Sequence, residues 1–266
     1  MRDDAQVLEN RRLEGVEVQE QYRQIHERHR IFPAVFEKRN HKRILDISSG
    51  VGIVGKRIQE FCDDTEVVCN DISEAALETM RRAGLKTISF DLDTEETPFP
   101  PGDNEFDAVI SLATIEHLIH CDHFMQELYR IISPGGHLYL SSPNYAGFLY
   151  LMPVLLTGHT FHNPLGPNTR YEFYAHVRYF TYNSLLSYVS SFGFVPEAAY
   201  VGVPRESTKF LQLKKSAPAK AFIFQNAMKA MCTTLSPRWA SEPVICFQKV
   251  SRSEQQKKPK VKKIVL

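Results

Sequence analysis

The fold is decided by residues 44–52, ILDISSGVG, where a short apolar run gives way to small residues. The run RILDI (43–47) has the length and the branched side chains of a buried strand, and a helical pattern follows it over 53–61. Serine and glycine in between let the backbone approach a ligand closely, and the start of the helix offers free N–H groups. The stretch therefore predicts a strand, a ligand-binding loop and a helix, in that order.

Further short apolar runs alternate with helical patterns along the chain. The other predicted strands are 66–70, 86–90, 106–112, 137–142, 194–202 and 243–250. Helical patterns cover 73–83, which opens on Ser73 as the N-cap, and 122–132, which the turn residues Ser133-Pro134-Gly135-Gly136 stop. Such alternation predicts a doubly wound, Rossmann-like α/β fold: a mostly parallel seven-stranded sheet with helices on both faces.

The chain divides into three expected parts. Residues 1–40 read as an N-terminal helical cap, 41–250 as the ligand-binding domain, and 251–266 as a basic, disordered tail. Within the domain, the aromatic and proline-rich insertion at about 143–180 reads as a lid. A helical excursion is expected at about 205–240, either with solvated lysines or as a surface that meets a lipid-linked substrate or a membrane face.

Composition narrows the function classes. The chain has 266 residues, 43% hydrophobic and 24% charged, and its formal net charge of +1 gives no global attraction for nucleic acid. Five cysteines without a CxxC pair favour a reduced, intracellular protein. The N-terminus lacks an apolar signal region, and the longest apolar run, 148–156, is too short to span a bilayer. We therefore expect a cytoplasmic protein without a transmembrane segment.

Carboxylates at the ends of the first three predicted strands indicate which ligand the loop binds. Residues 50–55 fit GxGxxG, which suits either a dinucleotide pyrophosphate or the methionine end of S-adenosylmethionine (SAM). Asp71 can accept both ribose hydroxyls of either ligand. Asp46 would repel a pyrophosphate but suits a cationic α-amino group, and Asp91 with Leu92 suits an adenine. The balance favours SAM.

Residues 43–142 resemble the class I SAM-dependent methyltransferases, particularly the broad small-molecule group. The matching segments keep the family's order and spacing over roughly 40–205: ILDISSGVG, VVCNDIS, the Asp91-Leu92 pair, PFPPGDNEFDAVISLATIEHL, LYRIISPGGHLYLSSPN and HVRYFTYNSLLSYVSSFGF. The family usually has glycine where Ser48 stands. Serine there costs about 1 kcal/mol if the position requires a positive φ.

The resemblance implies SAM as the cofactor and assigns its contacts. The loop residues would be Asp46, Ser48, Ser49, Gly50 and Gly52; Asp71 would bind the ribose; Ile72, Asp91 and Leu92 would contact the adenine; Ser111 and Leu112 would offer backbone to the methionine part. No metal is expected, because the His-x-x-His pair at 159 and 162 lacks further ligands at a recognisable spacing.

A hydroxyl acceptor must lose its proton as it is methylated, and histidine is the commonest base for that step. His117, after the fourth strand, is the first candidate, with a structural histidine that closes the cofactor site as the alternative. His176 is the second, with Tyr171, Arg178 and Tyr179 as substrate-side residues; a well-packed aromatic loop is the alternative there.

These features favour a methyltransferase for a small-molecule, sugar or lipid-linked acceptor, methylated at oxygen, with peripheral membrane contact allowed. Nucleic acid is not the expected acceptor, since the basic tail is short. Two alternatives stay open. The intact GxGxxG indicates an NAD(P)-dependent oxidoreductase, and Ser48 together with the unplaced base indicates a non-catalytic SAM-binding protein.

Overall fold

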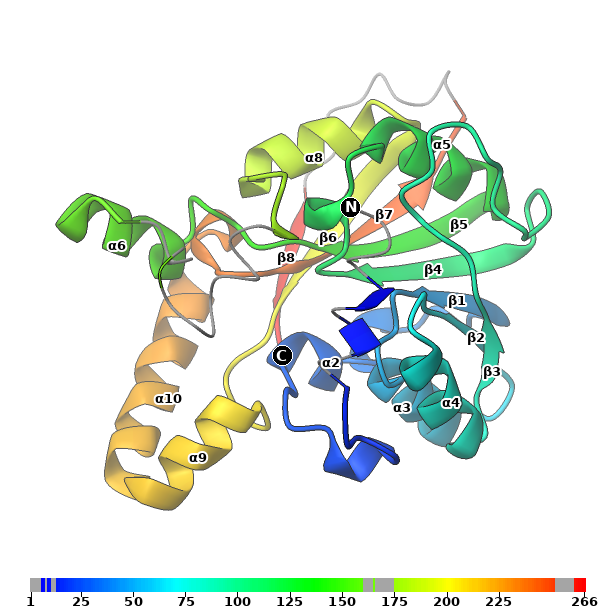
Figure 1. The fold of residues 1–266 in the computed structure, drawn as a ribbon. Helices are drawn as coiled ribbons and strands as arrows, with labels where there is room; N and C mark the ends of the chain where they lie inside the picture. Colours follow the sequence, from blue (N-terminus) through cyan, green and yellow to red (C-terminus); the bar gives the residue numbers. More distant parts are fainter. Residues whose placement is uncertain (1–5, 8, 11–12, 160–164, 166–174, 252–260) are drawn as a thin grey trace.

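The sheet organises the whole molecule. The computed structural model describes residues 6–7, 9–10, 13–159, 165, 175–251 and 261–266. Within these residues the strands form one eight-stranded sheet in the order β3-β2-β1-β4-β5-β7-β6-β8 (Figure 1). The strands are β1 (Arg43–Ile47), β2 (Glu66–Asn70), β3 (Lys86–Ile88), β4 (Phe106–Leu112), β5 (Ile132–Ser141), β6 (Phe194–Val201), β7 (Val244–Lys249) and β8 (Lys262–Val265). All seven predicted strands are confirmed.

Strands β1 to β5 run parallel, and β7 runs antiparallel to both β5 and β6. The order reverses at β1, which pairs with β2 on one side and with β4 on the other. In open parallel sheets, ligands bind outside the carboxyl ends of the strands at such a reversal. The fold therefore places the expected site at the ends of β1 and β4.

Helices cover both faces, as predicted (Figure 1). On one face lie α3 (Ile53–Phe61) and α4 (Glu74–Arg82), and on the other α5 (Cys121–Ile131) and α8 (Tyr182–Ser190). Successive residues of a strand point to opposite faces of the sheet. In β1, Ile44 packs in the core under α3 and α4, and Leu45 packs in the core under α5 and α8. Ser73 caps α4 as expected, since its Oγ accepts the Ala76 N–H at 3.3 Å.

The predicted N-terminal helical cap is made of short pieces in its described part. They are η1 (Gln19–Gln21), α2 (Glu27–Arg30) and η2 (Ala34–Phe36). Phe32, Val35 and Phe36 are buried in the core on the α3 side of the sheet. The boundaries of this cap and of the main domain remain our proposal.

The C-terminal end corrects one expectation. We expected residues 251–266 to form a disordered tail, but Lys262–Val265 form β8, which pairs in parallel with β6. Ile264 and Leu266 pack against the core on the α3 side of the sheet, and Val265 packs against a smaller cluster that includes Val201 and Val203. The lysines between 257 and 263 give the segment a basic composition, which hid the short apolar run at its end. Residues 252–260 lie outside the described part of the chain.

Three further helices and one turn connect the later strands. They are α6 (Phe148–Thr157), α9 (Thr208–Ser216), α10 (Pro218–Thr234) and the 3-10 turn η4 (Pro237–Trp239). Helices α9 and α10 occupy the expected excursion between β6 and β7. Among the described residues, no helix combines the length and the apolar character needed to cross a bilayer.

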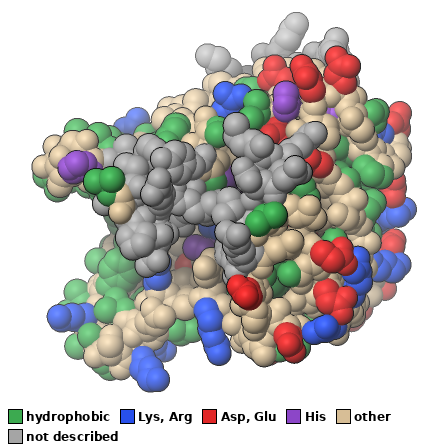
Figure 2. Space-filling model, viewed as in Figure 1, with side chains coloured by type: hydrophobic (Ala, Val, Ile, Leu, Met, Phe, Trp, Pro, Cys, Tyr) green, Lys and Arg blue, Asp and Glu red, His purple; other side chains and the backbone are tan. Residues whose placement is uncertain are grey.

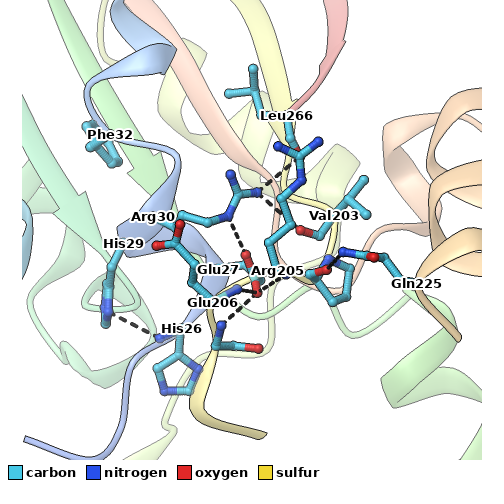
Figure 3. Close-up of polar contacts among 12 residues, drawn as sticks. His26, Glu27, His29, Arg30, Phe32, Val203, Arg205, Glu206, Gln225 and Leu266 are labelled. Atoms are coloured by element: carbon cyan, nitrogen blue, oxygen red, sulfur yellow. Dashed lines mark hydrogen bonds and ion pairs between the residues drawn. The ribbon is translucent and has the colours of Figure 1, made fainter. Parts of the chain in front are cut away.

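A partly buried carboxylate, that of Glu27, fastens α2 to the chain that leaves β6 (Figure 3). Glu27 Oε1 accepts the backbone N–H groups of Arg205, Glu206 and Ser207 at 2.6, 2.9 and 2.8 Å, and Oε2 accepts from Arg30 Nε at 2.6 Å. Burial works to raise the pKa of Glu27, but these hydrogen bonds outweigh it and hold the pKa below its usual value. The connection after β6 is therefore fixed at its first turn.

Candidate active site

The loop after β1 depends on left-handed backbone at three positions. Ser48, Gly50 and Gly52 have φ values of 54°, 58° and 77°. A Cβ on Gly52 would lie 2.6 Å from Leu85 and 2.7 Å from Met80, so this glycine is needed for packing, whereas a Cβ on Gly50 would meet nothing within 4 Å. Gly50 therefore supplies the backbone turn and leaves open space where a ligand can approach.

Ser48 occupies one of these left-handed positions without being glycine. Its φ of 54° answers the question raised by the sequence: the position does require positive φ. A side chain with a Cβ is strained there by about 1 kcal/mol. The loop keeps the expected shape in spite of the serine.

Asp71 holds the loops after β1 and β2 together. Its Oδ2 accepts the Gly50 N–H at 2.8 Å and its Oδ1 accepts the Ser73 N–H at 2.9 Å. Ser49 Oγ adds hydrogen bonds to the carbonyls of Asp46 and Asn70 at 2.6 and 3.1 Å. The two N–H groups fix the orientation of the Asp71 carboxylate, to which the ribose hydroxyls were assigned.

Asp46 is a buried acid suited to a cationic ligand. It is 3% exposed, and its Oδ2 has no hydrogen-bond partner within the described residues. Burial raises the pKa of Asp46 to about 7, and the nearby charge of Asp71 contributes in the same direction. A ligand ammonium group would favour the ionised carboxylate, whereas a pyrophosphate would oppose it. These residues therefore fit SAM better than a dinucleotide.

The remaining predicted cofactor residues lie along the same edge. Ile72 follows Asp71 and is half-buried, and its carbonyl accepts from Gln6 Nε2 at 3.0 Å. Asp91 Oδ1 accepts the Asp93 N–H at 2.8 Å, and Leu92 packs against the core on the α5 side.

Ser111 pairs with Ile47 across the sheet, and the buried Ser111 Oγ has no partner among the described residues. Leu112 ends β4 and is half-buried. The roles of these side chains toward the cofactor stay predictions.

The two predicted histidines come together although they are far apart in sequence. His117 closes the 3-10 turn η3 (Ile115–His117) after β4, and its ring lies 4.6 Å from that of His176, edge to face. Tyr145 Oη is hydrogen-bonded to His176 Nδ1 at 2.8 Å. His117 Nδ1 lies 3.1 Å from the carbonyl of Ala175, which can only accept, so Nδ1 carries the proton and Nε2 the lone pair when the ring is neutral.

Glu116 is a site residue that the sequence reading missed. It is fully buried, and neither carboxylate oxygen has a hydrogen-bond partner in the described part of the chain. Its Oε1 lies 3.9 Å from His117 Nε2. Burial raises the pKa of Glu116 to about 8, helped by the charge of Glu242. Near neutral pH the side chain is therefore mostly a protonated acid beside an imidazole.

The segment that carries His176 is docked onto this turn by its backbone. The N–H groups of Val177 and Arg178 donate to the Glu116 carbonyl at 2.9 and 3.0 Å. Arg178 Nη2 also donates to the Ile119 carbonyl at 2.7 Å, so the guanidinium ties two loops together.

Tyr179 is half-exposed, with its ring 4.6 Å from that of Tyr145. Tyr171 lies outside the described residues. The substrate-side roles proposed for Tyr171, Arg178 and Tyr179 stay predictions.

Two side-chain groups in the described chain have the donors to hold a metal ion. In each, the ligand atoms lie within 4.8 Å of one another; the groups are Glu116-His117-His176 and His137-Glu197-Cys246. In the second, Glu197 is already paired with Arg39 at 2.7 Å. The first can equally pass protons, because it joins an acid of raised pKa to two imidazoles.

Comparison with known proteins shows which family the chain resembles. Residues 16–199 match the family described as methyltransferase domain. The chain is 34% identical over 101 residues to a demethylmenaquinone methyltransferase of Thermus thermophilus, covering 36% of this chain and 45% of that protein. It is 35% identical over 105 residues to the ubiquinone/menaquinone biosynthesis C-methyltransferase UbiE of Coxiella burnetii, covering 37% and 41%. These matches span less than half the length of each relative.

Among solved structures, the YcgJ protein of Bacillus subtilis is similar, with a TM-score of 0.54 and 16% sequence identity. The similarity covers 85% of this chain and 100% of that one. At such low identity it shows a shared fold.

The strain at Ser48 predicts a stabilising substitution. Ser48→Gly should raise the free energy of unfolding by about 1 kcal/mol, because glycine adopts positive φ without a Cβ clash. Urea denaturation measures the change. Ser49→Gly is the matched control: it removes the Oγ hydrogen bonds to Asp46 and Asn70 without relieving a left-handed residue, and should lower stability. A loss of stability in Ser48→Gly would contradict the strain.

Glu116 predicts a pH dependence of stability. Its pKa in the folded protein, about 8, lies above the ordinary value of 4.5, so its contribution is fully present below about pH 4.5 and is lost as the pH rises through 8. Glu116→Gln is neutral at every pH and should lose less stability than the wild type between pH 5 and 9, in urea titrations. Asp46, whose pKa is also raised, adds the same pH dependence of stability to the wild type and to Glu116→Gln, so it does not affect the difference between them. The exposed Glu96→Gln should follow the wild type, and parallel curves for wild type and Glu116→Gln would refute the assignment.

Proposed function

Because the chain belongs to the class I SAM-dependent methyltransferase family, we propose that it transfers a methyl group from SAM to a hydroxyl group of a small-molecule or glycan acceptor. When bound, SAM supplies an electrophilic methyl group on a sulfonium. The oxygen–methyl bond forms as the methyl–sulfur bond breaks, S-adenosylhomocysteine leaves, and the hydroxyl proton must go to a base. The chain's own task is to bind, align and deprotonate.

The observation that carries the proposal is the cluster of His117, His176 and Tyr145 beside the buried Glu116. It lies beyond the carboxyl end of β4, on the edge of the sheet that carries the SAM loop. His117 Nε2 takes the acceptor proton, since Nδ1 is held by the Ala175 carbonyl. Glu116 Oε1 lies 3.9 Å from that nitrogen, and this carboxyl oxygen stabilises the resulting imidazolium electrostatically.

On the cofactor side, Asp71 binds the ribose and Asp46 binds the α-amino group. Asp71 is already held by two backbone N–H groups, so its carboxylate is oriented before the ligand arrives. Asp46 Oδ2, which has no hydrogen-bond partner in the described part of the chain, gains a charged donor when the ligand binds. Both acids thus act through contacts that the fold has prepared in advance.

A second candidate is methylation at carbon. It is favoured by the relatives, which are named as a demethylmenaquinone methyltransferase and a quinone-biosynthesis C-methyltransferase. The same base serves both outcomes, because a deprotonated ring hydroxyl can accept a methyl group at oxygen or at the adjacent ring carbon. A phenolic acceptor and mass spectrometry of the product distinguish them.

Cofactor binding is the first measurement. Isothermal titration should show binding of SAM and S-adenosylhomocysteine and no binding of NADH. Asp71→Ala should weaken SAM binding by about tenfold to a hundredfold, since it removes charge-assisted hydrogen bonds. Asp63→Ala, an exposed acid between α3 and β2, should leave it unchanged. Binding of NADH and not of SAM would contradict the methyltransferase proposal and favour an NAD(P)-dependent oxidoreductase.

Turnover is the second measurement, with tritiated SAM and a panel of sugars and phenols. His117→Ala should lower the rate constant by about a hundredfold, because general bases contribute that much or more, while SAM affinity stays within about twofold. His26→Ala, in the segment before α2, is the control and should retain full rate. Full activity of His117→Ala would reject it as the base, and SAM binding without transfer to any acceptor would indicate a non-catalytic protein.

A further inference from the structure

Helices α9 and α10 form a hairpin that projects from the domain; we call residues 208–234 the arm (Figure 1). The two helices pack on each other. In the 17 residues of α10, the buried side chains are Ala221 and Cys232. The arm belongs neither to the cofactor loop nor to the histidine cluster, so the proposed chemistry does not explain it.

The arm exposes large apolar side chains in succession. Phe222 and Ile223 are 69% and 68% exposed, and Phe224 and Leu211 are also exposed. Single apolar residues on a surface are ordinary, but three consecutive ones on a projecting helix mark an interaction site. The arm is therefore built to meet an apolar partner.

Helix α6 adds a second exposed apolar surface on the same side of the molecule (Figure 1). Its exposed residues are Leu149, Met152, Val154, Leu155 and Leu156. Phe148, at the start of α6, stacks on Trp239 in η4, the turn that follows α10, with ring centroids 5.0 Å apart. The roots of α6 and of the arm are thus joined, and both carry apolar side chains outward.

The charge of the arm is one-sided. From Ser207 to Ser241 the sequence contains no Asp or Glu but six basic residues, whereas the whole chain is nearly balanced at 32 basic and 31 acidic residues. The six are Lys209, Lys214, Lys215, Lys220, Lys229 and Arg238, and all are exposed. Figure 2 shows apolar and basic side chains gathered over this part of the molecule. The partner must therefore offer negative charge as well as apolar surface.

The arm is held firmly at its root (Figure 3). Glu27 fixes the backbone of residues 205–207, and Gln225 Nε2 of α10 donates to the Pro204 carbonyl at 2.6 Å. The Thr208 N–H donates to the Ile25 carbonyl at 2.9 Å, and Thr208 Oγ1 accepts the Ile25 N–H at 3.0 Å. A fixed root keeps the apolar and basic residues in one orientation toward the partner.

We propose that the arm and α6 dock on the surface of an anionic phospholipid bilayer. Phe222, Ile223 and the outer leucines of α6 enter the boundary between headgroups and acyl chains, and the lysines lie against lipid phosphates. A second copy of this chain would set the same six cations against each other, which like-charge repulsion opposes. The described helices are too short or too polar to cross the bilayer, so the contact is peripheral.

Vesicle flotation with the full chain tests the proposal. The protein should bind to vesicles made of equal parts of phosphatidylcholine and phosphatidylglycerol. It should bind much more weakly to vesicles of phosphatidylcholine alone. Binding should weaken at high salt, because exposed charges are screened. A Phe222→Ser, Ile223→Ser, Phe224→Ser triple variant, and separately a Lys214→Glu, Lys215→Glu double variant, should each bind at least tenfold more weakly.

Matched controls separate docking from folding and from catalysis. Phe61→Ser changes a residue of α3 that is 68% exposed, as Phe222 is at 69%, and should bind like the wild type. Lys38→Glu, an exposed lysine before β1, controls for charge. All variants should keep the wild-type Tm and SAM affinity, so a failure of the proposed methyl transfer would leave this result interpretable.

Wild-type binding that is equal on neutral and anionic vesicles, or a triple variant that floats like the wild type, would overturn the proposal. So would a wild-type dimer in analytical ultracentrifugation that the triple variant abolishes while neither protein binds vesicles, because the surface would then belong to a second copy of the chain.

Discussion

The Asp71 carboxylate accepts the N–H of Gly50 at 2.8 Å and that of Ser73 at 2.9 Å, and much of the site depends on these two hydrogen bonds. They join the loop that leads into α3 to the cap of α4, so the ends of β1 and β2 are held as one surface. Gly52 permits this approach because any side chain there would strike Met80 and Leu85. A ligand therefore meets donors and acceptors already in place. The strain at Ser48 persists because the surrounding hydrogen bonds fix the backbone more strongly than one unfavourable φ disfavours it.

The strands were predictable because their signal is local. RILDI and FDAVISL are short runs whose neighbours are turn residues or helical patterns, and both form strands over the predicted residues. Lys262–Val265 was missed because the lysines before Ile264 make this segment basic, so its short apolar end did not stand out in the sequence. Pairing with β6 decides the conformation of this segment, and no local pattern reports a partner more than sixty residues away.

The site was predictable in the parts that follow strands and unpredictable in the parts that depend on tertiary contact. Asp46 and Asp71 could be placed because strand ends meet at one edge of a parallel sheet. The burial of Glu116 could not, since a glutamate before His117 reads as polar surface. It is buried because the backbone of Val177 and Arg178 docks on its turn, and that contact joins segments about sixty residues apart. Tyr145 likewise could not be assigned to the site from the sequence, because only its hydrogen bond to His176 places it there.

The two sets of site residues reach the common edge from different halves of the sheet. The proposed cofactor residues lie at the ends of β1, β2 and β3, whereas Glu116, His117, Tyr145 and His176 follow β4 and β5 or precede α8. After a gene duplication, the segments of the second half can therefore diverge while Asp71 and the glycine loop keep their hydrogen bonds. A descendant of such a chain can acquire a new acceptor without first losing its methyl donor, and variation within a lineage should accumulate unevenly between the two halves.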